Sequence, residues 1–350
     1  DTESHANHLF HTRYKSELCE ILIKKPNKLG IHRAGDTVEG TVKYVLKKAE
    51  CYQNITLCLI GRGLVIWSTS TLRTSSTCTG KEKFEAQFIS LLDRTDDGSV
   101  TVEKGEYSHQ FTFTLQSDLP SSFRDGRCTI SYNLVIEFDR KSYFSRNQKF
   151  SKEIFVCSDY MPYSSIPIIF GLERVLIKPF TSKQHIITIK IELQNTLIAP
   201  GQYIPLIISV NNNTNVDIIV IKNELIRYTR YRANAGNKKK HKKIIKESTQ
   251  TTKGVKSYDI LKTFVKVPTV ADLRTIEHSY IMKRDFKIKV TAILPLPHRK
   301  ASIEIPIILG ETVEEFVIED VASEDCYFVN KTNDYRIFKL TIFLVCFLNP

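Results

Sequence analysis

Short stretches in which apolar and polar residues alternate recur along most of the chain. Between residues 37 and 45, for example, Val38, Val42 and Tyr44 fall on alternate positions. A period of two residues places such side chains on one face of an extended strand. No stretch carries a long apolar stripe at helical spacing, so the pattern predicts an all-β protein. Strands are expected at 18–23, 37–45, 55–60, 110–115, 129–138, 150–156, 186–193, 204–210, 218–227, 259–267, 286–294 and 303–309.

The number of expected strands indicates two β-sandwiches. The apolar face of a strand must be buried against a second sheet, and one sandwich takes about 100 residues and seven or so strands. An internal repeat supports this division, because Ala34-Gly-Asp-Thr-Val38 recurs 166 residues later as Pro200-Gly-Gln-Tyr-Ile204. Apolar positions after both turns keep the same offset, as Val42 does with Ile208. We interpret the repeat as a duplication of one immunoglobulin-like sandwich.

These observations predict the order of parts along the 350 residues. The prediction is a flexible N-terminus (1–16), a first sandwich (17–165), a linker (166–181), a second sandwich (182–310) and a tail (311–350). The tail begins with seven acidic residues and no basic residue up to Asp325, and it continues with an apolar stretch at 338–348. One hypothesis is that the acidic part folds onto lysines 238–243 and competes with acidic ligands.

Composition and charge narrow the functional classes. Hydrophobic residues make up 42% of the chain, which excludes disorder and coiled coil as the overall class. The 50 basic and 38 acidic residues give a net charge of +12, which favours acidic partners. The longest apolar run, 340–348, is half of the roughly 18 residues that a membrane helix needs. The eight cysteines form no C-x-x-C pair, and reduced thiols are favoured over a disulfide framework.

Basic residues are densest between Lys222 and Lys246. This segment holds ten lysines and arginines against Glu224 alone, a net of 10 − 1 = +9. Its centre, residues 237–243, follows Ala-Asn-Ala-Gly and is predicted to be a hairpin loop or turn. Anionic headgroups attract each such residue with about 1 kcal/mol, so the loop is a candidate for phosphate or anionic-lipid binding; the alternative is an ordinary solvated loop. No aromatic residues interleave the lysines, which disfavours nucleic acid as a partner. The candidate residues are Lys238, Lys239, Lys240, Lys242 and Lys243.

Several segments in the same order resemble a known family. The turn and strand Arg33-Ala-Gly-Asp-Thr-Val-Glu-Gly-Thr-Val42 is similar to the start of arrestin N-terminal domains, and Ile60-Gly-Arg-Gly-Leu-Val-Ile-Trp67 is similar to a strand of the α-arrestin branch. The run from Gly105 to Leu115, Leu119-Pro-Ser-Ser-Phe123 and Ile130-Ser-Tyr-Asn-Leu134 fit the same domain, while Ala199–Ile204 and Ile305–Gly310 fit the C-terminal domain. The resemblance covers residues 17–310.

The resemblance implies a cytoplasmic adaptor, peripheral at the plasma membrane and endosomes. It implies binding to the cytoplasmic tails of membrane proteins and a role in their endocytosis, sorting or transport, with anionic lipids as a second partner class. In the visual and β branch a lysine pair near Lys24 and Lys25 senses phosphates, so this pair is a further candidate, as is Arg62 in a Gly-Arg-Gly turn; the alternative for each is a solvated strand end. The chain has no Pro-Pro-x-Tyr motif, so ubiquitin-ligase recruitment is not supported.

No motif points to catalysis. The chain has no G-x-S-x-G, no P-loop and no complete dinucleotide fingerprint, so we expect no enzymatic activity, no catalytic or metal-binding residues and no cofactor. The histidines at 5, 8 and 11 lie in a polar terminus that is interpreted as a disordered tail. Two alternatives stay open: a retromer-type coat subunit of the same fold, and a secreted or cell-surface adhesion protein with glycans at Asn54 or Asn212. A hydrolase is disfavoured, because no nucleophile–base pair is evident.

Overall fold

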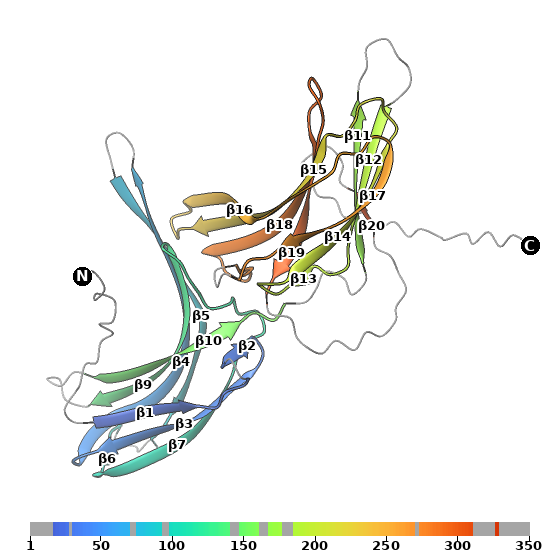
Figure 1. Ribbon diagram of the computed structural model, residues 1–350. Coiled ribbons are helices and arrows are strands. Elements are labelled where there is room, and N and C mark those ends of the chain that lie inside the picture. The colour runs from blue at the N-terminus through green and yellow to red at the C-terminus, as the bar shows by residue number, and fades with distance from the viewer. Residues whose placement is uncertain are drawn as a thin grey trace, which may run out of the picture. The chain divides into compact units, whose positions relative to one another are not determined.

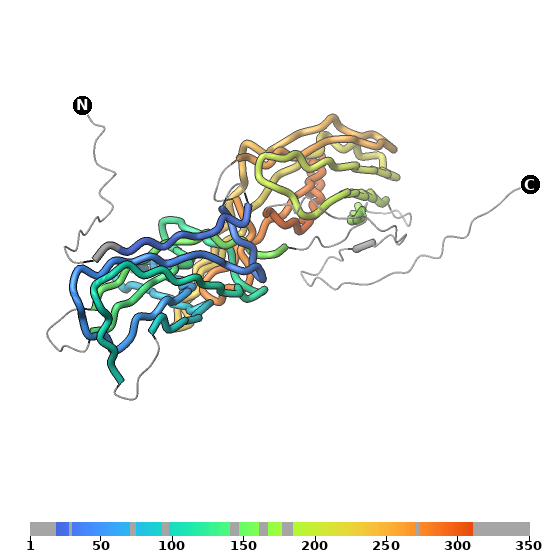
Figure 2. The backbone as a smooth tube through the Cα atoms, turned by 90° about the horizontal axis from the view of Figure 1, so that it is seen from below, coloured from blue at the N-terminus to red at the C-terminus, as the bar shows by residue number. Residues whose placement is uncertain are grey.

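The described part of the chain is built from strands. The computed structural model describes residues 17–27, 30–70, 75–92, 98–140, 147–160, 167–176, 185–269, 273–310 and 326–328. The backbone traces in Figures 1 and 2 show strands side by side and no helix among these residues. The chain forms two compact units. The first unit consists of 1–64, 81–123 and 129–158, and the second of 65–80, 124–128 and 159–350.

The first sandwich consists of two sheets. One sheet has the order β1 (Glu17–Ile23), β3 (Thr37–Leu46) and β7 (Gly105–Thr114). The other has the order β2 (Ile31–Arg33), β10 (Gln148–Cys157), β9 (Cys128–Arg140), β4 (Glu50–Ser70) and β5 (Ser75–Ser90), with β6 (Val100–Val102) beside β4 and β8 (Phe123–Arg124) beside β9. The inward residues of the two sheets pack against one another, since the buried ring of Tyr44 on β3 meets that of Phe138 on β9 edge to face at 5.2 Å.

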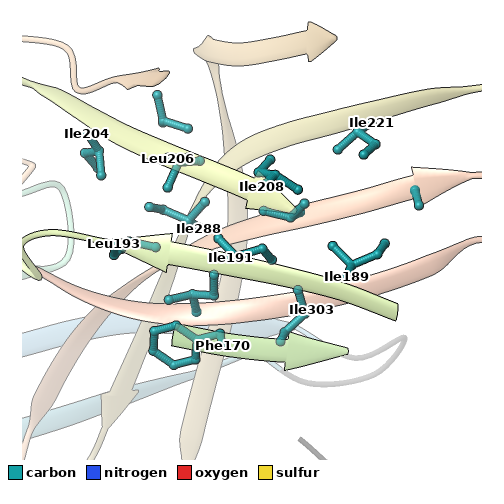
Figure 3. Packing of buried hydrophobic residues seen from close by; sticks show 14 of the residues in the cluster. Phe170, Ile189, Ile191, Leu193, Ile204, Leu206, Ile208, Ile221, Ile288 and Ile303 are labelled. Atoms are coloured by element: carbon teal, nitrogen blue, oxygen red, sulfur yellow. The ribbon is translucent and has the colours of Figure 1, made fainter. Parts of the chain in front are cut away.

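The second sandwich has the same construction. One sheet runs β17 (Tyr258–Lys266), β14 (Tyr203–Asn212), β12 (His185–Leu193), β11 (Ile168–Leu176) and β20 (Cys326–Phe328). The other runs β13 (Leu197–Ile198), β19 (Ala301–Leu309), β18 (Met282–Ile293), β15 (Val220–Arg232) and β16 (Lys238–Thr252). Figure 3 shows the core between them, where Ile191 and Ile208 of one sheet lie near Ile288 of the other. All three side chains are fully buried.

The structure confirms the internal repeat. Strands β3 and β14 differ by 166 residues at both ends. The preceding turns are alike, because Gly35 and Gly201 both have φ 92°, and each donates its N–H to a residue after the neighbouring strand, Gln116 or Val267. The equivalent short strands β2 and β13 both pair in parallel, with β10 and β19 respectively. The sheets β2-β10-β9-β4-β5 and β13-β19-β18-β15-β16 therefore share one strand order, in which β16 occupies the place that β5 occupies in the first sandwich, while the second sandwich has β11 and β20 in addition.

One expected boundary differs from the structure. The segment 166–181, which we expected as a linker, contains β11, which pairs along its whole length with β12. Ile168, Phe170 and Leu176 of this strand are buried in the second core. Gly171 and the charged residues after it break the apolar alternation, which explains why the strand is weak in the sequence. The N-terminus 1–16 with its histidines, the acidic stretch 311–325 and the apolar stretch 338–348 lie outside the described residues.

Two features bear on the compartment in which the chain acts. The cysteines with described side chains (19, 51, 58, 78, 128 and 157) are all free thiols, consistent with the expectation of reduced thiols. The sequon residue Asn212 is buried, and its Nδ2 donates to the carbonyl oxygens of Val216 and Lys256, both at 2.9 Å. A glycan on that nitrogen would disrupt both bonds. Among the described ranges we find no helix whose length and apolar character would let it cross a bilayer.

The matched glycine turns generate a prediction on stability. An L-residue with a side chain is strained at φ 92°, and Gly201 additionally has Thr269 Oγ1 at 3.2 Å from the position of a Cβ. Gly35→Ala should therefore lower the free energy of unfolding by about 1–2 kcal/mol, and Gly201→Ala by at least as much. Urea denaturation measures both. Gly126→Ala is the control, since Gly126 has no positive φ and open space around it; an equal loss in this variant would contradict the prediction.

Candidate anion-binding surface

The lysines that we predicted to lie in a hairpin loop lie instead in a strand. The turn comprises only residues 233–237, where Gly236 has φ 89° and Ala233 N–H donates to the Asn237 oxygen. Pairing of β15 with β16 begins at Arg232 and Lys238 and continues through Arg227 and Lys243. The loop prediction was wrong because the tight turn is already complete at Asn237, so the backbone of the next residues is free to extend.

Strand β16 lies at the end of its sheet and carries the candidate lysines on both faces. Directly opposite residues of an antiparallel pair point to the same side. Lys240 is paired with Arg230 and Lys242 with Tyr228, so these two lysines share the outer face of the sheet with Lys238. Lys239 and Lys243 lie on the other face. All are exposed except Lys239, which is half-buried.

On the outer face, part of the charge is already neutralised. Lys242 Nζ lies 3.0 Å from Glu304 Oε1 and 4.9 Å from the centre of the Tyr228 ring. Tyr228 OH donates to the same carboxylate at 2.8 Å, and Lys287 lies 3.6 Å from it. Burial raises the pKa of Glu304, but the donors Tyr228 and Lys242 outweigh burial and hold this pKa below its usual value. Glu304 is therefore ionised and offsets much of the Lys242 charge.

The other lysines of β16 remain available for a ligand. Within the described ranges, no ion pair involves Lys238, Lys239, Lys240, Lys243 or Lys246. His241 lies among them, and its pKa is lowered by burial and then by the positive charges of Arg127 and Lys239. Its ring is neutral near pH 7 and adds no charge. The available positive charge on β16 therefore comes from the lysines.

An ion pair between a buried arginine and a partly buried aspartate lies beneath the start of the β15–β16 hairpin, within the second unit. Arg284 is 1% exposed, and its Nη2 lies 3.2 Å from Oδ2 of Asp125, whose side chain is 20% exposed. Tyr231 OH donates to the same oxygen at 2.6 Å, and the N–H groups of Arg127 and Cys128 donate to Oδ1 at 2.8 Å. Burial raises the pKa of Asp125, but these donors and the Arg284 charge together lower it. The ionised carboxylate thus fixes Tyr231, whose ring packs edge to face on His241 at 6.1 Å.

The remaining candidates lie in the first unit and on different sheets. Lys24 follows β1 and forms an exposed ion pair with Glu39 at 3.1 Å, while the adjacent Lys25 is exposed. Arg62 is exposed in the middle of β4, so the predicted Gly-Arg-Gly turn was wrong. The adjacent Gly61 serves packing rather than a turn, because a Cβ there would lie 2.6 Å from the Tyr132 ring. Lys24 and Lys25 therefore do not form one site with Arg62.

Comparison with protein families gives a match for each of the two β-sandwiches. Residues 19–161 match the model "Arrestin (or S-antigen), N-terminal domain", and residues 183–313 match "Arrestin (or S-antigen), C-terminal domain". The two matches span 143 + 131 = 274 of the 350 residues. The chain belongs to the arrestin family. A comparison with curated proteins found no match.

Membership defines the general class of function. Proteins of the arrestin family are in general adaptors without enzymatic activity that bind membrane-protein cargo. The chain is accordingly an arrestin-like adaptor in this general sense. Which surface binds and what it binds depend on the residues of this chain, among which β16 has the densest available charge.

The buried ion pair generates a prediction with a defined pH dependence. Asp125→Asn should lower the free energy of unfolding by about 3 kcal/mol, because it removes the carboxylate charge that faces the buried Arg284 guanidinium. A lowered pKa means that the Asp125 contribution is present above the unfolded value of about 3.9 and is lost as pH falls through the folded value. The difference in the free energy of unfolding between wild type and variant should therefore become smaller from pH 7 to pH 3, as measured by urea denaturation.

The matched control is Asp285→Asn. Asp285 forms an ion pair with Arg230 at 2.5 Å, but the two side chains are 27% and 50% exposed. Such a surface pair contributes less than about 1 kcal/mol. An effect of Asp125→Asn no larger than that of Asp285→Asn would contradict a structural role for the buried pair.

Proposed function

We propose that this chain is an adaptor of the α-arrestin branch that binds acidic or phosphorylated cytoplasmic tails of membrane proteins and directs these proteins into endocytosis or sorting. It acts in the cytoplasm, at the plasma membrane and endosomes. The observation that carries the proposal is the row of exposed lysines on β16, most of which have no acidic neighbour. The free thiols and the buried Asn212 favour this reading over a secreted adhesion protein.

The branch assignment is supported by residues of the first sandwich. The stretch from Ile60 to Trp67, which resembles α-arrestins, lies in β4 with Trp67 buried at 4% exposure. Ligase recruitment is not part of the proposal, since the chain has no Pro-Pro-x-Tyr motif. A coat subunit of the same fold would differ by copurifying with a coat complex rather than with cargo.

Several weak charge interactions account for reversible tail binding. Each phosphate or carboxylate gains a charge-assisted hydrogen bond from a lysine, and salt screens these exposed contacts. Lys24, Lys25 and Arg62 are proposed as further phosphate contacts on the first sandwich. Their arrangement on separate sheets gives each of them a smaller effect than the clustered lysines of β16.

The structure allows the lysines to be ranked in advance. We expect Lys240→Gln to weaken binding of a fluorescent phosphoserine- and glutamate-rich peptide more than Lys242→Gln, because Glu304 already offsets the charge of Lys242. Lys238→Glu combined with Lys240→Glu should raise the Kd about tenfold, equivalent to about 1.4 kcal/mol. Fluorescence anisotropy of the full chain at low and at physiological salt gives these values.

The control uses lysines of another edge strand. Lys262→Gln combined with Lys266→Gln removes two exposed charges from β17 and should change the Kd less than twofold. An equal effect of the β17 pair would show attraction by net charge rather than by a site on β16. If anionic vesicles bind through the β16 lysines and the peptide does not bind, the partner is a lipid surface and the proposal fails.

A further inference from the structure

We infer that β16 binds its acidic ligand as an added β-strand, so that the ligand is an extended peptide paired with the free edge of the sheet. This inference rests on the proposed function, because it takes the β16 lysines as the binding site. It adds the backbone of β16 as a binding group and fixes the conformation of the ligand. The edge of β16, as used here, comprises residues 238–244.

The hairpin geometry identifies the backbone groups that face outward. Ala233 N–H donates to the Asn237 oxygen at 2.9 Å, so this opposed pair is hydrogen-bonded. Hydrogen-bonded and non-hydrogen-bonded pairs alternate along an antiparallel ladder. The N–H and C=O groups of 239, 241 and 243 therefore point to β15, and those of 238, 240, 242 and 244 point away from it. In agreement, Arg232, opposite Lys238, donates its N–H away from β16, to Ile281.

The edge is exposed to solvent from Lys240 to Ile244. β16 is the last strand of its sheet, as its position at the border of the sandwich in Figure 1 shows. Its side chains from Lys240 to Ile244 are exposed on both faces, and burial begins only at Ile245. Beyond Ile245 the pairing with β15 is irregular: the register shifts between Asn223 and Leu225. The exposed part is thus a regular strand of five residues, within the usual length of a β-strand and long enough to pair with a short peptide.

The lysines make this edge selective for an acidic strand. Alternate residues of an added strand point to opposite faces of the sheet. Acidic residues on one face would meet Lys238, Lys240 and Lys242, and those on the other would meet Lys239 and Lys243. Lysine on an edge strand normally prevents association with other strands. Two copies of β16 would repel each other in this way, whereas an acidic peptide would be attracted to the lysines.

The duplicated fold supplies an internal comparison. Strand β5 has the place in the first sandwich that β16 has in the second, and it too is an edge. It carries Lys81 and Lys83 against Glu82 and Glu85, a net of 2 − 2 = 0. β16 carries six lysines against Glu247, a net of 6 − 1 = +5. The edge position does not itself require a row of lysines, so the charge on β16 reflects its ligand.

An extended peptide fits the edge better than a bilayer does. The outward N–H and C=O groups need hydrogen-bond partners whenever a ligand excludes water from them. A second backbone in β conformation presents donors and acceptors at the matching spacing, as in other cases of strand addition. Lipid headgroups present no such regular row of donors. The combination of open backbone and lysines on both faces therefore favours a peptide.

The test separates strand addition from attraction between charges. The probe is a fluorescent nine-residue peptide with glutamate at even positions and threonine or valine at odd positions. Two further peptides carry backbone N-methyl groups, one at the even and one at the odd positions. Because only one set of peptide N–H groups can face β16, one methylated peptide should bind at least tenfold more weakly than the other in anisotropy with the full chain.

A protein variant tests the same edge from the other side. Ile244→Pro removes an outward N–H without changing charge and without removing a bond to β15. It should weaken binding of the unmethylated peptide at least tenfold, while Ile244→Ala should leave the Kd within twofold. Circular dichroism confirms that both variants are folded. If Ile244→Pro unfolds the chain, the comparison of the two methylated peptides still decides the question.

The outcomes distinguish this inference from the proposed function. If both methylated peptides bind as tightly as the parent, the lysines act by charge alone; the inference is then overturned while the proposed function stands. If none of the three peptides binds, the proposed tail-binding surface fails and the inference fails with it. Binding of anionic vesicles through the same lysines, with no peptide binding, would likewise overturn both.

Discussion

The structure depends on the burial of alternate side chains between two facing sheets. Each sandwich has an inner row from both sheets, such as Ile191 and Ile208 facing Ile288, and these residues are removed from water completely. The outward residues of the same strands are not constrained by packing and can carry charge. A sandwich also leaves each sheet open at its edges, since it does not close as a barrel does. The basic outer face and the free edge of β16 both follow from this construction.

The sequence was sufficient to predict the fold class and the duplication. Period-two alternation identified most of the strands, and the Gly35 and Gly201 turns identified the repeat because only glycine adopts φ 92° without strain. The errors share a physical origin. The residues from Lys238 to Ile244 are polar or exposed on both faces, with only Lys239 half-buried, so they show no apolar alternation and resemble a loop. At Arg62 the flanking Gly61 suggested a turn, whereas it makes room for the Tyr132 ring.

The candidate binding site could be predicted from the sequence only through its high density of basic residues. A run of lysines is visible in the sequence, but their individual environments are set by residues far along the chain. Glu304 is 62 residues from Lys242, and Asp125 is 159 residues from Arg284. These pairs depend on the register of β15, β18 and β19 and on the position of the 124–128 turn. No local pattern encodes that register, so the ranking of the lysines required the structure.

The two copies of the sandwich show how one fold position can acquire a binding role. A change of charge on an edge strand leaves the core intact, because the outward side chains and the free backbone groups take no part in its packing. β5 and β16 hold equivalent positions and differ by five units of net charge. After a duplication, one edge can therefore become selective for acidic ligands while the other stays neutral. The constraint that fixes the interior thus leaves the edge as the place where specificity changes most easily.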